Sequence, residues 1–115
     1  MKPSQDKVFL TRTGDMADLD CLVFCFERAG AQLEGFVIKT GTEFRAYLNH
    51  CPHTGISLNW NTPDFFDVAK EYIQCCMHGA LFQPLDGLCI YGPCINESLF
   101  ALDIVIESER LYFLI

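Results

Sequence analysis

Short apolar runs separated by turn-forming residues dominate the hydrophobic pattern of this 115-residue chain. Residues 8–10, 21–26, 33–39 and 43–48 are rich in aliphatic and aromatic side chains, and polar or glycine-containing segments separate them. Such side chains favour strands, and runs of this length are typical of strands rather than helices. The pattern therefore predicts a small antiparallel all-β fold with little helix.

Two hairpins are expected where turn residues separate neighbouring strands. Thr40-Gly41-Thr42 lies between residues 33–39 and 43–48. Ser108-Glu109 lies between residues 103–107 and 110–115. Connections of two to five residues are typical of antiparallel hairpins, so both pairs of strands should be adjacent in a sheet.

Residues 21–26 are apolar at every position, which predicts a strand buried on both faces. Cys21 and Cys25 lie on one face of that strand and are expected to be small buried residues. Cys89 and Cys94 lie on either side of a Gly-Pro loop. Ordinary packing is the simpler interpretation of this second pair, and an influence on a nearby cofactor is the alternative.

The composition is that of a folded domain. Half of the residues are apolar and ten are Phe, so a single domain over residues 1–115 can build a small core that a metal site would reinforce. Eight basic against fifteen acidic residues give a net charge of −7. This charge argues against nucleic acid as a partner and favours docking onto a basic protein surface.

The sequence favours a cytoplasmic protein. Residues 1–7 are mostly polar, and no apolar stretch reaches the roughly 20 residues that a membrane span needs. Seven cysteines without a visible leader indicate a reducing compartment rather than a disulfide framework. We expect no membrane or nucleic-acid partner, and nothing in the sequence requires more than a monomer.

Two short Cys/His clusters carry the candidate chemistry. Cys51-Pro52-His53 and Cys75-Cys76-Met77-His78 each offer one thiolate and one imidazole. Four such ligands suit tetrahedral zinc, or an iron–sulfur cluster in which two His replace two Cys on one iron. Because a C-x-H pair is tighter than the usual half of a zinc finger, the spacing favours the iron–sulfur cluster.

The residues around the two clusters resemble the loops of the Rieske [2Fe–2S] family. The first loop reads Asn-His-Cys-Pro-His-Thr-Gly-Ile-Ser-Leu over residues 49–58, and the second reads Cys-Cys-Met-His-Gly-Ala-Leu-Phe over residues 75–82. The resemblance extends over about residues 44–115. It implies one [2Fe–2S] cluster held by Cys51, His53, Cys75 and His78.

Cys75 and Cys76 compete for one ligand position. Only Cys75 stands three residues before His78, which is the spacing of the second Rieske loop. Cys76 would form a C-x-H pair, which belongs to the first loop. We therefore assign Cys75 as the ligand and Cys76 as its neighbour.

The same resemblance implies an antiparallel β-sandwich with a cluster-binding subdomain of two loops at one tip, formed by about residues 49–94. Asp86-Gly87 would lie in the hairpin after the second loop, where Asp-Gly favours a two-residue turn. Gly92-Pro93 would form the proline loop that covers the cluster in this family.

One segment departs from the family pattern. The 21 residues between His53 and Cys75 are more than we expect, and the extra material falls in residues 61–72. A turn of helix is expected within it. The neighbouring aromatic residues Trp60, Phe65 and Phe66 either form a patch for docking a partner or pack into the core.

Residues beside the ligands place the chain near the low-potential, oxygenase-associated branch. Ile56 and Met77 occupy positions where high-potential Rieske proteins carry a disulfide, and Ala80 and Phe82 replace a Ser and a Tyr that donate hydrogen bonds to cluster sulfurs. Such bonds stabilise the more negative reduced cluster, so their loss lowers the potential. We expect a midpoint near the low end of the Rieske range, roughly −150 mV.

The residue inventory favours an electron carrier over an enzyme. A mononuclear iron site needs two His and a carboxylate, and only His50 remains after the cluster takes two of the three His. Nor are any two of the eight glycines two residues apart, which excludes a G-x-G nucleotide fingerprint. We expect a ferredoxin that passes one electron at a time from a flavoprotein reductase to a terminal oxygenase.

Two other functions remain open on the sequence. One is the small Rieske-like subunit of an assimilatory nitrite reductase, which has a similar length and fold. The other is a non-catalytic metal-binding or sensing module that holds zinc or a labile cluster for structural reasons. Zinc would leave the protein colourless, and a stable complex with a large sirohaem subunit would identify the nitrite reductase component.

Overall fold

The computed structural model describes residues 7–50, 52, 58, 65–67, 69, 71–75 and 79–114. Within them the chain is all-β, with a single 3₁₀ turn (Thr13–Asp15) as its helical element. None of these residues belongs to a helix with the length and hydropathy of a membrane span. The all-β prediction is confirmed.

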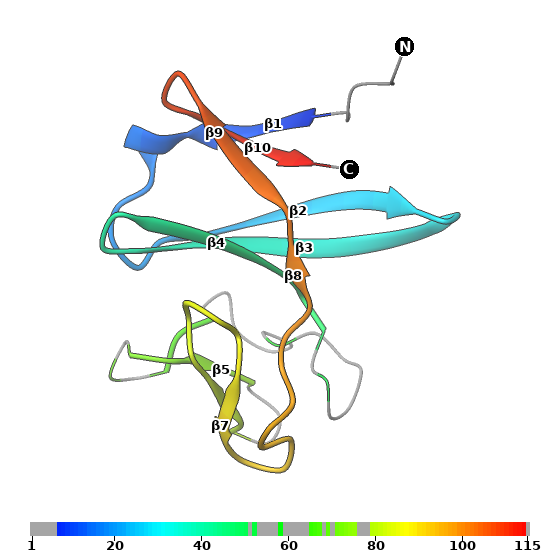
Figure 1. Ribbon diagram of the computed structural model, residues 1–115, viewed down its shortest axis with the longest axis vertical. Helices are drawn as coiled ribbons and strands as arrows, with labels where there is room; N and C mark the ends of the chain where they lie inside the picture. The colour runs from blue at the N-terminus through cyan, green and yellow to red at the C-terminus, as the bar shows by residue number, and fades with distance from the viewer. Residues whose placement is uncertain are drawn as a thin grey trace.

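The strands form three antiparallel sheets (Figure 1). The first has the order β1 (Lys7–Arg12), β10 (Arg110–Leu114), β9 (Ile104–Glu107). The second has the order β2 (Cys21–Arg28), β3 (Ala31–Thr40), β4 (Glu43–Leu48), β8 (Ala101–Leu102). The third has the order β5 (Ile73–Gln74), β6 (Leu81–Phe82), β7 (Cys89–Tyr91).

The second sheet is the middle layer of the molecule, and strand β3 is buried on both of its faces. Phe36, Val37 and Ile38 are each fully buried. Because neighbouring side chains on a strand point to opposite faces, Val37 enters one core and its two neighbours enter the other. The first core lies against the β1-β10-β9 sheet and contains Leu111 and Phe113. The second core lies against the β5-β6-β7 layer, as the ribbon in Figure 1 indicates.

The prediction that residues 21–26 are buried on both faces is wrong. These residues form β2, which is an edge strand of its sheet. Phe26 is buried against Phe113, with ring centroids 4.8 Å apart. Val23 is 42% exposed, and Cys25 on the same face is exposed as well. The β2–β3 hairpin extends past the layer below it (Figure 1), which agrees with the exposure of Val23 and Cys25.

Both predicted hairpins are present. Strands β3 and β4 pair around Gly41, which has a φ of 63°. Strands β9 and β10 pair around Ser108 and Glu109, with φ values of 53° and 63°. Two consecutive positive φ values are the signature of a type I′ turn, whose twist matches that of the flanking strands.

The turn at Asp86-Gly87 is longer than predicted. Four residues, 84–87, connect the pair formed by Gln83 and Leu88, because the Gln83 N–H donates to the Leu88 carbonyl at 2.9 Å. The Gly87 N–H donates back to the Gln83 carbonyl at 2.7 Å. Only Gly87 has a positive φ, 75°, so Asp-Gly ends a four-residue loop instead of forming a two-residue turn.

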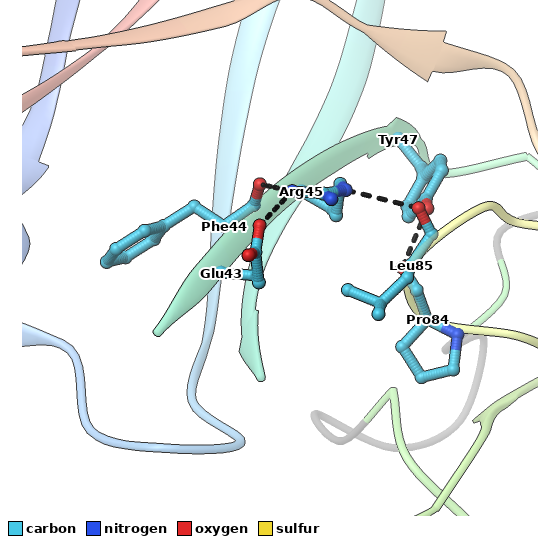
Figure 2. Close-up of polar contacts among 6 residues, drawn as sticks. All are labelled: Glu43, Phe44, Arg45, Tyr47, Pro84 and Leu85. Atoms are coloured by element: carbon cyan, nitrogen blue, oxygen red, sulfur yellow. Dashed lines mark hydrogen bonds and ion pairs between the residues drawn. The ribbon is translucent and has the colours of Figure 1, made fainter. Parts of the chain in front are cut away.

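Side chains from β4 hold this four-residue loop against the middle sheet (Figure 2). The Tyr47 hydroxyl donates to the Pro84 carbonyl at 2.7 Å, and Arg45 Nε donates to the Leu85 carbonyl at 3.1 Å. Tyr47 is buried, and burial raises the pKa of its hydroxyl to about 12. These bonds oppose a tight two-residue turn because they draw the carbonyls of residues 84 and 85 toward β4. They attach the β5-β6-β7 layer to the rest of the fold.

Candidate metal centre

Cys75 directly follows β5 and begins the loop that connects β5 to β6. Its N–H donates to the Ala80 carbonyl at 2.9 Å, and its own carbonyl accepts the Gly79 N–H at 2.9 Å. Gly79 has a φ of 69°, a left-handed conformation that a side chain would strain. The Cys75 side chain is fully buried. The pairing of β5 with β6 therefore fixes the predicted ligand in an interior position.

Asn49 closes the segment that contains the first Cys/His pair. Its side-chain Oδ1 accepts the Leu58 N–H at 2.8 Å, and its Nδ2 donates to Glu34 Oε1 at 2.7 Å. The Asn49 N–H also donates to the Glu34 carbonyl at 2.8 Å. Asn49 is the single buried polar residue of the described chain. Sequence reasoning missed this role, because Glu34 and Leu58 are remote from Asn49 in the sequence.

The Gly92-Pro93 loop packs against the second Cys/His loop. Gly92 has a φ of 107°, and a Cβ built on it would lie 2.8 Å from the Ala80 Cα. Ala80 in turn accepts the Cys75 N–H through its carbonyl. A glycine is required because the two backbones approach this closely. This contact places the predicted covering loop directly against the backbone partner of the predicted ligand Cys75.

The other predicted ligands, Cys51, His53 and His78, lie outside the described residues, as does the competing Cys76. The assembly of the four ligands therefore stays a prediction. His50, the one His outside the predicted ligand set, is exposed.

The described part of the insertion packs into the core. Phe65 is fully buried and stacks on Phe36, with ring centroids 4.1 Å apart and planes 10° apart. Phe66 is buried as well and forms a bridge with Ile73. These two residues are therefore core residues and not a docking patch. Trp60 and most of the predicted helical turn lie outside the described residues.

The turn that follows is stabilised by an acidic side chain. Asp67 Oδ1 accepts the N–H groups of Glu71 and Tyr72 at 2.9 and 3.1 Å. Asp67 also donates its own N–H to the Tyr72 carbonyl at 2.9 Å. Residues 65–67 and 72–74 are thus the two arms of a hairpin that leads directly into Cys75.

The surroundings of Cys75 suit an iron–sulfur cluster. Its sulfur belongs to an apolar core from which water is excluded, and thiolate sulfur is the ligand that iron–sulfur clusters use. Ala80 and Phe82 are both fully buried in the same core and carry no hydroxyl group. The residues that hold such a cluster would be Cys75 and the three other predicted ligands, Cys51, His53 and His78.

Comparisons with known structures agree with this fold. A chain from the complex of reduced oxygenase and oxidized ferredoxin in carbazole 1,9a-dioxygenase superposes with a TM-score of 0.71 at 23% identity, covering 96% of this chain and 94% of that one. The ferredoxin of carbazole 1,9a-dioxygenase from Nocardioides aromaticivorans IC177 gives 0.68 at 20% identity, covering 94% and 96%.

A larger protein contains a domain of the same fold. The terminal oxygenase of carbazole 1,9a-dioxygenase from Novosphingobium sp. KA1 superposes with a TM-score of 0.72 at 14% identity, and the match covers 96% of this chain but 30% of that chain. A comparison with curated proteins found no match.

The family itself is identified by sequence. The model of the Rieske [2Fe-2S] domain matches residues 8–107, which is most of the chain. The match includes both Cys/His clusters, the buried Cys75 and the loop around Gly92. The protein therefore belongs to the Rieske [2Fe–2S] domain family, and its cofactor is a single [2Fe–2S] cluster.

Proposed function

We propose that this protein is a one-electron carrier that passes electrons from a flavoprotein reductase to a terminal oxygenase. The observation that carries the proposal is the similarity, over nearly the whole of both chains, to a ferredoxin of carbazole 1,9a-dioxygenase. The net charge of −7 suits docking onto a basic partner, so the electron-transfer rate should fall as salt rises. We place this carrier in the cytoplasm as a monomer.

The chain is an electron-transfer component and not an enzyme. An oxygenase would need a second iron site with two His and a carboxylate. Of the three His in the sequence, His53 and His78 serve the cluster, and only the exposed His50 is left. The organic substrate and the oxygen chemistry therefore belong to the partner.

We assign the cluster ligands as Cys51, His53, Cys75 and His78. The interior position of Cys75 supports its part in this set. Residues 1–115 act as one domain, with the cluster-binding part at about residues 49–94. The [2Fe–2S] centre supplies one-electron redox chemistry, and it is neutral when oxidised and carries −1 when reduced with neutral His ligands.

We further assign the protein to the low-potential branch of the family. Ala80 and Phe82 offer no side-chain donor to the cluster sulfurs, and both are fully buried. Without such donors the reduced cluster is less stabilised, so the midpoint should lie near the low end of the Rieske range, roughly −150 mV.

The proposal is tested by spectroscopy and redox titration of the purified protein. We expect a coloured protein that takes up one electron per chain. Its reduced form should give a rhombic EPR signal with a lower average g than an all-cysteine [2Fe–2S] cluster. A colourless, EPR-silent protein containing zinc would overturn the carrier and leave a structural metal module. Co-purification with a large sirohaem subunit would instead assign it to a nitrite reductase.

Ligand identity is tested by a pair of cysteine variants. Cys75→Ser should abolish the rhombic signal, because it removes a thiolate ligand. Cys76→Ser should keep the signal, because its neighbour supplies the ligand. The reverse result would move the ligand to Cys76 and overturn the assignment.

A further inference from the structure

Two cysteines outside the predicted ligand set lie against each other beside the Gly92-Pro93 loop. Cys94 Sγ donates to Cys89 Sγ at 3.3 Å, and Cys89 Sγ donates to the Tyr91 carbonyl at 3.2 Å. Both side chains are 1% exposed. They belong to the same core as Cys75. A chain of S–H hydrogen bonds therefore links the two ends of the loop.

The backbone holds the two cysteines within bonding reach. The Cys89 N–H donates to the Glu97 carbonyl at 2.8 Å, and the Glu97 N–H donates to the Cys94 carbonyl at 2.9 Å. Both cysteines are thus anchored to the same residue. A disulfide has an S–S distance of about 2.05 Å, so the two sulfur atoms would have to approach by roughly 1.3 Å. A small rotation of the side chains and of the loop between them supplies a movement of this size.

We propose that Cys89 and Cys94 form a dithiol–disulfide modification site whose oxidant is a peroxide. One thiol attacks the peroxide, which breaks the O–O bond, forms a sulfenic acid and releases water. The second thiol then attacks the sulfenic sulfur, which forms the S–S bond and releases a second water. Two thiols and one hydrogen peroxide thus give one disulfide and two waters.

The segment that carries the two cysteines borders solvent. Tyr91 and Ile95, next to the two cysteines, are 63% and 54% exposed. The peroxide therefore enters by local opening of this segment, which costs less free energy than global unfolding. Because the partner sulfur is already in contact, the sulfenic acid is trapped as a disulfide before further oxidation.

The modification would act on the cluster site through one contact, an inference that depends on the proposed function. The loop between the cysteines carries Gly92, which packs on Ala80. Ala80 pairs with the predicted ligand Cys75 through a backbone hydrogen bond. A disulfide would replace two weak S–H bonds by a covalent link and would hold the loop against the cluster-binding hairpin. Regulation of the cluster by peroxide is the expected result.

The test is peptide mapping of the cluster-loaded protein after treatment with hydrogen peroxide. The dose is kept below the level at which visible absorption of the cluster declines, and remaining thiols are then alkylated. We expect the mass of the treated chain to be lower than that of the untreated chain by two hydrogen atoms. After chymotryptic cleavage at Tyr91, the fragments with Cys89 and Cys94 should stay joined until a reductant is added. Oxidation of the exposed Cys25 without this link would overturn the proposal, and so would a link to a different cysteine.

Matched variants separate the pair from the other cysteines. Cys94→Ser should prevent the loss of two hydrogens, whereas Cys25→Ser on the exposed end of β2 should behave as the parent protein does. The mapped link in the parent protein decides the question even where a serine variant fails to fold. The link and the EPR signal are independent measurements. A protein that forms the Cys89–Cys94 link but is EPR-silent would overturn the carrier function and keep the modification site. A protein that gives the EPR signal but forms no link would keep the carrier function and overturn the modification site.

Discussion

The side chain of Asn49 accepts a hydrogen bond from the backbone of Leu58, nine residues further along the chain, at 2.8 Å. The same carboxamide donates to Glu34 at 2.7 Å. Only a side chain with both a donor and an acceptor can make these two bonds together. The segment that carries Cys51 and His53 is therefore closed at its base by one buried amide.

Replacing Asn49 with Ala should destabilise the protein and loosen its cluster. The Leu58 N–H would lose its partner in a buried position, which costs about 1–3 kcal/mol. Urea unfolding measures the stability, and the decay of visible absorption in the presence of a chelator measures cluster loss. His50→Ala, at the exposed neighbouring position, is the control and should leave both unchanged. Equal behaviour of the two variants would contradict the role of Asn49.

A methyl group at Gly92 should disturb the contact between the Gly92-Pro93 loop and the second Cys/His loop. Gly92→Ala places a Cβ 2.8 Å from the Ala80 Cα at a φ of 107°, so strain of about 1–3 kcal/mol is expected. Gly14→Ala is the control, because no atom lies within 4 Å of a Cβ at that position. Thermal unfolding should separate the two variants by several degrees. A Gly92→Ala protein as stable as Gly14→Ala would refute the contact.

Tyr47 should make stability fall with pH in the alkaline range. Burial, and to a lesser extent Asp86, raises the pKa of Tyr47 from 10.0 to about 12. The folded state therefore retains the proton that the unfolded state releases. The resulting stabilisation is complete below pH 10 and is lost as the pH rises from 10 to 12, by about 1.4 kcal/mol per pH unit.

The phenylalanine variant isolates this effect. Tyr47→Phe should cost about 1 kcal/mol at neutral pH through the lost bond to the Pro84 carbonyl. Between pH 10 and 12 its stability should fall less steeply than that of the parent protein. Tyr91→Phe, at a position that is 63% exposed, serves as the control. Parallel pH profiles for Tyr47→Phe and the parent would show that this hydroxyl does not titrate as proposed.

New hydroxyl groups at positions 80 and 82, in the core that contains Cys75, should raise the reduction potential. Ala80→Ser and Phe82→Tyr would each introduce a hydroxyl donor at a position whose present side chain has none. Hydrogen bonds to cluster sulfur stabilise the reduced state. A potentiometric titration should place both midpoints above that of the parent protein. Phe9→Tyr, at an exposed position of β1, should cause no shift. Unchanged midpoints in both core variants would argue against the low-potential assignment.

Local signals in the sequence predicted the strands and hairpins but not which strand is enclosed. Residues 21–26 are as apolar as the centre of β3, yet β2 lies at a sheet edge and β3 lies inside. Burial depends on the neighbours that the topology supplies, and these are not encoded in the run itself. The Asp86-Gly87 turn was misjudged for a similar reason, because Tyr47 and Arg45 reach it from a strand almost forty residues away.

The candidate site shows the same division between local and distant information. The C-x₂-H spacing identified Cys75 as the ligand candidate, and the hairpin register places its side chain in the interior. The closure by Asn49 and the stacking of Phe65 on Phe36 were not predictable, because each joins residues far apart in the sequence. Motifs thus indicate the chemistry, whereas the supports of the motifs come from the fold.

The burial of β3 on both faces has a consequence for how the sequence of such a domain can change. Val37 belongs to one core, and Phe36 and Ile38 belong to the other, which also contains Cys75. Adjacent residues of one strand belong to the two cores. A change of side-chain size at Val37 therefore also moves the backbone of Phe36 and Ile38, which pack in the core that contains Cys75. Adaptation to new partners should therefore proceed through the exposed loops and edge strands, where substitutions leave the packing of β3 unchanged.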